Sequence, residues 1–197
     1  MKPERRRGEE LETAILNAAY DIIQTDGYEG LTFQRVAKQA QTSRTVIYRR
    51  YGTPVDLLHA LILYKSTQAL GGRMIDLFQD QGSLRENLLA VVNIYQRFFD
   101  SVGSELLGAV LTEFSRNHER FRAWSEQARN SNIRIMKKVE DYARQRGEIT
   151  RDFTEIQMSL PFDLLRVENI IRNEKVTTAY LIRLVDEVLM PIFSGKA

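Results

Sequence analysis

Residues 31–51 read LTFQRVAKQAQTSRTVIYRRY, the most informative segment of the chain. Within it, Thr32 and Ser43 are each suited to cap the start of a short helix, and Gln41-Thr42 interrupts the apolar pattern between the two helices. Two short helices joined by a tight turn form the outline of a helix-turn-helix unit. In such a unit the second helix enters the major groove of DNA and presents its first residues to the base edges.

The second helix is predicted to run from Ser43 to about Arg50. Ile47 and Tyr51 are four residues apart, so they are expected to lie on one face and point into the core. The other side chains of this helix are then free to face DNA, and they are Arg44, Thr45, Tyr48, Arg49 and Arg50.

The charge pattern is compatible with that role. Residues 30–55 carry five basic residues and no acidic one, in a chain with 28 Lys/Arg and 26 Asp/Glu. Residues 1–53 carry nine basic residues against seven acidic ones, whereas residues 54–197 carry 19 of each. A surface that faces phosphate needs to lack carboxylates, because a carboxylate repels the polyanion. Taken alone, the pattern is equally compatible with chance.

The apolar period is helical along the whole chain, and no sustained alternation indicates a strand. The sequence therefore predicts an all-α protein of about nine helices. Gly52-Thr53-Pro54 is a sharp boundary, with Thr53 suited to the N-cap and Pro54 to the first helical position. The helices are expected at about residues 9–25, 32–40, 43–50, 54–70, 83–100, 104–117, 120–146, 152–172 and 177–193.

Residues 31–51, followed by GTPVDLL at residues 52–58, resemble the TetR family of bacterial transcriptional regulators. The resemblance covers about residues 9–69 and implies a three-helix DNA-binding domain there. It also implies a larger helical domain, residues 70–197, that dimerises and binds a small effector. Members of this family mostly repress transcription and leave a palindromic operator when the effector binds.

The resemblance also implies which residues contact DNA. Thr32 falls at a helix cap that contacts phosphate, and Arg35 at a position that reaches phosphate or base. Tyr48 falls on a tyrosine that commonly contacts phosphate. The full set expected at the DNA is Thr32, Arg35, Ser43, Arg44, Thr45, Val46, Tyr48, Arg49 and Arg50.

The chain departs from the family pattern at three places. Gln41 takes the place of a glycine in the turn, which costs about 1–2 kcal/mol if the position is left-handed. Thr45-Val46 replaces Gly-Thr, so base readout is expected to differ, and Pro54 replaces a lysine that often holds a phosphate.

The basic residues Arg5, Arg6 and Arg7 precede the first helix. They fit an arm that reaches the minor groove, as basic arms do in other DNA-binding proteins. A solvated tail is the alternative, and it is the interpretation that the sequence favours.

Two apolar stripes mark the last two helices, where the family forms a four-helix dimer interface. Burial inside the monomer is the alternative for each stripe. The residues expected at the interface are Leu160, Leu164, Val167, Ile171, Leu181, Leu184, Val185 and Val188.

The sequence does not identify the effector. In the family the ligand cavity lies among the helices of the larger domain, so an aromatic-lined cavity for a mostly apolar compound is expected. Aromatic residues at helical spacing are also ordinary core. Large side chains in this region are Tyr95, Phe98, Phe99, Phe114, Phe121, Trp124 and Met136.

Other classes of protein fit less well. The chain has no cysteine and two histidines, without a metal-binding spacing, a phosphate loop or a nucleophile motif. No metal, cofactor or enzymatic activity is therefore expected. No apolar stretch is long enough to span a bilayer, so a cytoplasmic protein without membrane contact is expected. The alternative function is a helical adaptor or scaffold whose DNA-binding head has lost its activity.

Overall fold

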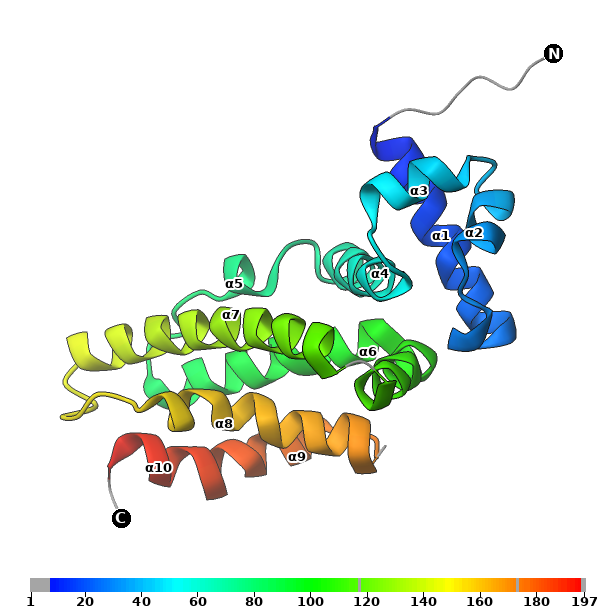
Figure 1. The fold of residues 1–197 in the computed structure, drawn as a ribbon. Helices are drawn as coiled ribbons and strands as arrows, with labels where there is room; N and C mark the ends of the chain where they lie inside the picture. The colour runs from blue at the N-terminus through cyan, green and yellow to red at the C-terminus, as the bar shows by residue number, and fades with distance from the viewer. Residues whose placement is uncertain (1–7, 117, 173, 196–197) are drawn as a thin grey trace. The chain divides into compact units, whose positions relative to one another are not determined.

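The computed structural model describes residues 8–116, 118–172 and 174–195, with side chains except at 116, 118, 120 and 121 (Figure 1). Regular structure in these residues is helical throughout, so the predicted all-α class is confirmed. The chain packs into two compact units. The first takes in the described residues up to Ser66 and those of Val102–Phe121, and the second those of Thr67–Ser101 and from Arg122 onward. The predicted domain limits of 9–69 and 70–197 stay a prediction.

The first unit is built around the amphipathic helix α1, whose core face includes Ile15, Ala19 and Ile22. Gly27, with φ of 70°, ends this helix in a conformation that favours glycine. The elements that begin in this unit are α1 (Glu9–Asp26), the 3-10 turn η1 (Tyr28–Gly30), α2 (Phe33–Gln39), α3 (Arg44–Arg50) and α4 (Pro54–Leu70).

Capping residues set where the short helices begin. Thr32 accepts a hydrogen bond from the backbone N–H of Arg35 at the start of α2. Thr53 does the same for Asp56 at the start of α4, where Pro54 is the first helical residue. Both predicted caps are confirmed. Each satisfies a backbone donor that the first turn of a helix leaves unpaired.

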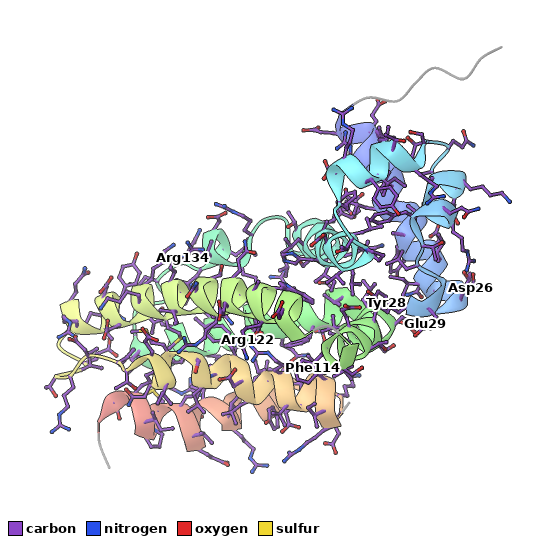
Figure 2. All side chains as sticks on the ribbon, in the orientation of Figure 1. Asp26, Tyr28, Glu29, Phe114, Arg122 and Arg134 are labelled. Atoms are coloured by element: carbon purple, nitrogen blue, oxygen red, sulfur yellow. The ribbon has the colours of Figure 1, made fainter. Side chains whose placement is uncertain are left out.

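A buried carboxylate ties the end of α1 to the segment that follows residue 102. Glu113 is 6% exposed and accepts a 2.7 Å hydrogen bond from the hydroxyl of Tyr28, which Figure 2 labels beside Asp26 and Glu29. Glu113 belongs to α6 (Leu84–Arg116), whose helical geometry is interrupted at Gly103, with φ of 79°. The predicted break between residues 100 and 104 is therefore confirmed.

The second unit is a bundle around buried residues that include Leu88, Val92, Met136, Phe162 and Val185. Its last two helices each pass from α-helical into π-helical geometry. Besides the first part of α6, its elements are α5 (Met74–Leu77), α7 (His118–Gln145), α8 (Glu155–Arg166), the π-helical η2 (Val167–Arg172), α9 (Thr178–Arg183), the π-helical η3 (Leu184–Leu189) and α10 (Met190–Ser194).

The start of α8 differs from the sequence-based expectation. The sequence predicts a helix start at about residue 152, where Asp152 is a suitable capping residue, whereas Thr154 is the N-cap and forms a reciprocal capping box with Gln157. Asp152 instead pairs with Arg144 near the end of α7. The expectation was wrong because a basic partner across the turn holds the carboxylate, leaving the hydroxyl of Thr154 to satisfy the helix N-terminus.

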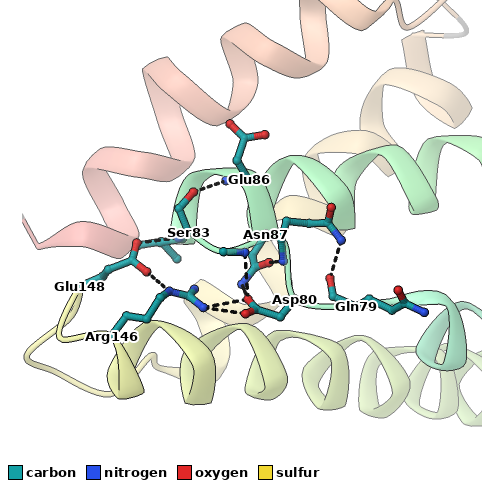
Figure 3. Close-up of polar contacts among 10 residues, drawn as sticks. Gln79, Asp80, Ser83, Glu86, Asn87, Arg146 and Glu148 are labelled. Carbon is teal, nitrogen blue, oxygen red and sulfur yellow. Dashed lines mark hydrogen bonds and ion pairs between the residues drawn. The ribbon is translucent and has the colours of Figure 1, made fainter.

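A polar cluster fastens the start of α6 to the end of α7 (Figure 3). Arg146 donates to both oxygens of Asp80 at 2.8 and 2.9 Å and also pairs with Glu148. Asn87 donates to Asp80 at 2.7 Å, and Glu148 accepts from the backbone N–H of Leu84 at 2.6 Å. We call these four residues, Asp80, Asn87, Arg146 and Glu148, the α6–α7 clamp.

Candidate nucleic-acid interface

The turn between α2 and α3 has the hydrogen bonds of a helix C-terminus. The N–H of Thr42 donates to the carbonyl of Ala37 at 2.9 Å, which satisfies an acceptor that α2 leaves free. Gln41 lies inside this turn with φ of 54°, the left-handed conformation that the family's glycine would adopt without strain. The turn is therefore kept in its helix-turn-helix geometry at a cost in backbone energy.

Helix α3 begins at Ser43, whose hydroxyl accepts from the N–H of Val46 at 3.3 Å, as predicted. Ile47 is fully buried and Tyr51 is 6% exposed, so the predicted inward face is confirmed. The opposite face carries Arg44, Thr45, Tyr48 and Arg49, all exposed, and we call these four residues the α3 face.

The other residues proposed to contact DNA differ in their exposure to solvent. Thr32, Arg35, Ser43 and Arg50 are exposed, whereas Val46 is half-buried because it lies between the two faces of α3. Val46 therefore presents less surface than its neighbours.

Two of the arginines already have acidic partners. Arg35 is hydrogen-bonded to Asp26 at the end of α1, and a guanidinium nitrogen of Arg50 lies 3.6 Å from a carboxylate oxygen of Glu12. By contrast, Arg44 and Arg49 form no ion pair with any residue that the structure describes. Their positive charge is thus available to a polyanion without breaking an existing pair.

Tyr51, beneath the α3 face, has its pKa raised to about 12. Burial of the hydroxyl is the main cause, and the negative charge of Glu12 adds to it. Tyr51 therefore stays neutral at any physiological pH, in keeping with a structural role under the helix.

Aromatic contacts link α2 to the α3 face. The ring of Phe33, which is 5% exposed, meets the ring of Tyr48 edge to face with centroids 4.7 Å apart. The guanidinium carbon of Arg44 lies 6.0 Å from the centroid of the Tyr48 ring. The N-terminal arginines 5–7, the other proposed contact, lie outside the described residues.

The proposed dimer residues divide into three groups by exposure. Leu181, Leu184 and Val185 are at most 6% exposed within the single chain, so the alternative of burial inside the monomer holds for them. A side chain that the subunit already covers has little surface left for a partner. Leu160 and Leu164 are half-buried, and the exposed members are Val167, Ile171 and Val188.

One exposed apolar residue of α9 is absent from the predicted interface. Ile182 is 37% exposed and precedes the π-helical segment. The most apolar stripe of these helices lies mainly inside the subunit, and Ile182 is on another face. Its only signal in the sequence is an apolar position directly before a charged residue, Arg183.

The region expected to hold an effector is closely packed. Tyr95 contacts Phe99 and Phe162 edge to face, and Phe98 stacks on Tyr95, so these aromatics form core contacts. Phe114 is exposed, Met136 is fully buried and Trp124 is half-buried. Phe121 is among the residues whose side chains the structure does not describe. An apolar pocket without room for a water molecule is lined by Met74, Val91, Ile94, Tyr95, Ile135 and Phe162.

Comparison with known proteins identifies the family. The model for bacterial regulatory proteins of the tetR family matches residues 15–61, and that for the tetracyclin repressor-like C-terminal domain matches residues 78–188. An HTH-type transcriptional regulator of Mycobacterium tuberculosis is 29% identical over 182 residues, covering 91% of this chain and 86% of the relative. The DNA-binding transcriptional repressor TetR of Mycobacteroides abscessus is 32% identical over 91 residues, covering 46% and 45% of the two chains.

Solved structures show the same fold. FadR from Bacillus subtilis, in complex with stearoyl-CoA, matches with a TM-score of 0.63 at 22% identity, covering 94% of this chain and 99% of that one. The two family models match the N-terminal and C-terminal parts of the chain in that order. The chain belongs to the TetR family of bacterial transcriptional regulators, which are not enzymes.

Proposed function

We propose that this protein is a homodimeric regulator that represses transcription from a palindromic operator and is released by a small molecule. The observation that carries the proposal is the α3 face. Arg44 and Arg49 extend from it without an acidic partner among the described residues, and buried Ile47 and Tyr51 hold it in place from beneath. A helix presented in this way fits the major groove.

In this proposal the residues divide between phosphate and base. Thr32, at the start of α2, and Tyr48 position the helix through phosphate contacts, which carry little sequence information. Arg44 and Thr45, in the first turn of α3, read base edges. Arg35 contributes to DNA binding only when it leaves, or shares, its carboxylate partner Asp26.

Dimerisation follows from the exposed apolar side chains on the last two helices. Ile171 is 68% exposed, Val167 is 41% exposed, and Ile182 and Val188 are each 37% exposed. Pairing this face with a second copy removes it from water and brings two α3 helices to one duplex. Two half-sites on one side of the DNA require the helices to be about 34–36 Å apart.

The effector in this proposal is a mostly apolar molecule that binds the second unit. The solved relative FadR from Bacillus subtilis is in complex with stearoyl-CoA, so long-chain acyl compounds are the first class to test. The apolar pocket has no room even for a water molecule, so binding requires the helices around it to separate. Helix α4 begins in the first unit and ends in the second. In this proposal, a movement of α4 on effector binding causes the release of DNA. Such a regulator acts in the cytoplasm, where the genome is.

The test begins with a randomised 30-base-pair duplex library, from which the full-length protein selects its binding sites. We expect a palindromic consensus, and light scattering of the protein at micromolar concentration is expected to give about twice 22.8 kDa. Arg44→Ala is expected to lose about 1–3 kcal/mol of discrimination at one base pair in each half-site, whereas Tyr48→Phe should weaken all sequences alike. Failure to enrich any consensus would support the adaptor alternative instead.

A further inference from the structure

The spacing of Arg44 and Tyr48 places them on one side of the recognition helix. They are four residues apart on α3, where side chains at this spacing are neighbours. The guanidinium carbon of Arg44 lies 6.0 Å from the centroid of the Tyr48 ring, at the edge of the range in which an aromatic ring attracts a cation. The contact lies within one helix, so it exists before any DNA arrives.

The Tyr48 ring is supported from behind. Phe33, the first residue of α2, is buried and meets this ring edge to face at 4.7 Å, an arrangement that aromatic pairs prefer. Tyr48 itself stays 52% exposed. The ring therefore lies between the core and the solvent, with a buried aromatic neighbour packed against it.

An exposed arginine has many rotamers of similar energy, and binding DNA in one of them costs conformational entropy. An aromatic ring that favours some rotamers of the arginine lowers this entropy cost, because the side chain is already partly ordered before it binds. The α3 face offers an internal comparison, because Arg49 has no ring contact of this kind among the described residues.

We propose that the ring of Tyr48, buttressed by Phe33, is a platform that positions Arg44 to read its base. This inference rests on the proposed function, in which Arg44 contacts a base edge. It assigns Tyr48 a second role that does not depend on its hydroxyl. Tyr48 is thus a positioning residue for specificity as well as a phosphate contact.

The experiment separates the ring from the hydroxyl. The wild-type protein, Tyr48→Phe, Tyr48→Leu, Arg44→Ala and the double variant Arg44→Ala/Tyr48→Leu each select from the same 30-base-pair library. Tyr48→Phe keeps the ring and removes the hydroxyl, whereas Tyr48→Leu removes both and keeps an apolar contact for Phe33. Thermal melting followed by circular dichroism checks that each variant folds, which is expected because position 48 is half exposed to solvent.

The platform predicts a specific pattern of base preference. Tyr48→Leu should reduce discrimination by about 2- to 5-fold at the base pairs that Arg44→Ala affects, the fold-change that a surface cation–π contact represents. Tyr48→Phe should keep the wild-type preference at those base pairs, and the double variant should be no less selective there than Arg44→Ala alone.

Two results would overturn the platform while leaving the regulator function intact. The first is wild-type discrimination by Tyr48→Leu at the base pairs that depend on Arg44. The second is an Arg44→Ala variant that changes no base preference, since Tyr48 would then have no reader to position. Failure of the proposed function itself is recognised earlier, because the wild-type protein would then select no consensus.

Discussion

Gln41 is the residue at which this chain carries backbone strain. Its φ of 54° lies in the left-handed region, where a residue with a Cβ is disfavoured, and the hydrogen bond from Thr42 to Ala37 holds the turn in that shape. The sequence departs from the family pattern here without changing the geometry of the turn. The surrounding packing between α2 and α3 therefore compensates for the strain.

Replacing Gln41 by glycine is expected to stabilise the protein. Relief of about 1–2 kcal/mol of left-handed strain outweighs the entropy of about 0.5–1 kcal/mol that glycine adds to the unfolded chain. Gln41→Gly should thus raise the free energy of unfolding by about 1 kcal/mol, measured from the midpoint of urea unfolding. The control is Gln34→Gly within α2, which should lower stability by about 1 kcal/mol, and equal effects of both changes would argue against strain at Gln41.

Arg35 forms an ion pair with Asp26, and in the proposed complex this carboxylate competes with DNA for the arginine. The pair is about half exposed to solvent, so it contributes little to stability, yet it neutralises one of the five basic residues of the acid-free segment. If Arg35 contacts DNA as proposed, the charge of Asp26 also disfavours the phosphate backbone.

Asp26→Asn is expected to tighten DNA binding because it frees Arg35. The plot of log K against log salt should become steeper by about 0.9 if one further phosphate is neutralised. Fluorescence anisotropy with a selected duplex at several salt concentrations measures both quantities. Asp21→Asn on the same helix is the matched control, with the same change in charge and no arginine partner among the described residues. A steeper slope in both variants would indicate a general charge effect.

At the scale of elements, the last two helices have two apolar faces. Leu184 and Val185 lie inside the subunit, whereas Ile171 and Val188 face outward. A glutamate at position 184 would place a charge in the core and unfold the protein, so it cannot test dimerisation. The outward residues are the ones that report on a partner.

Ile171→Glu is expected to give monomers that bind the operator weakly. Burial of a new carboxylate against a second subunit is unfavourable, whereas the same side chain is solvated in the monomer. Light scattering should fall from about twice 22.8 kDa to one subunit mass, with unchanged helicity by circular dichroism. Gln127→Glu on the exposed surface of α7 should leave the mass at the dimer value. A dimeric Ile171→Glu protein would place the interface elsewhere.

The α6–α7 clamp makes stability depend on pH. The amide of Asn87 and then the guanidinium of Arg146 donate to Asp80, and they hold its pKa below the ordinary value of 3.8. A carboxyl group whose pKa is lowered by folding stabilises the native state above its unfolded pKa, and this contribution is lost as pH falls through the lowered value.

We therefore expect the free energy of unfolding to fall as the pH drops below about 5, with part of that fall due to Asp80. Asp80→Asn should be less stable than the wild type at pH 7 and should lose less stability on acidification. Urea unfolding between pH 7 and pH 3 measures the two slopes. Parallel curves for the two proteins would show that this carboxyl group does not contribute to the acid response.

At the scale of the whole molecule, regulation requires a coupling between an effector and DNA. An effector changes the affinity for DNA only by its differential affinity for two conformations, which is typically about 1–3 kcal/mol. That range corresponds to a loss of roughly 5- to 150-fold in operator affinity. In the proposed function, the small apolar pocket belongs to the conformation that binds DNA, and a ligand favours a more open one.

Stearoyl-CoA, titrated into the complex of protein and selected duplex, is expected to lower the affinity for DNA by roughly 5- to 150-fold. Ile94→Phe adds volume to the pocket lining and should reduce this response while leaving DNA affinity unchanged. Ile133→Phe is the control, since Ile133 is also half-buried but does not line the pocket. An identical response from both variants would move the effector site away from this pocket.

The helical class, three of the helix caps and the buried face of α3 are all readable from the order of the residues. Thr32, Ser43 and Thr53 act through hydrogen bonds to residues three positions along the chain, so their role is readable from local order. Ile47 and Tyr51 follow from the helical period, because one face of a short helix beside another has to be buried.

By contrast, the ion-pair partners of charged side chains and the burial of apolar ones depend on how the helices pack. Asp152 pairs with Arg144 instead of capping α8, and Asp26 occupies Arg35, because residues eight or nine positions apart come together only when the turns between their helices are formed. Burial of Leu184 and exposure of Ile171 likewise depend on which side of each helix the rest of the bundle covers. An apolar stripe shows that a face avoids water, but packing alone determines whether its own chain or a second one covers it.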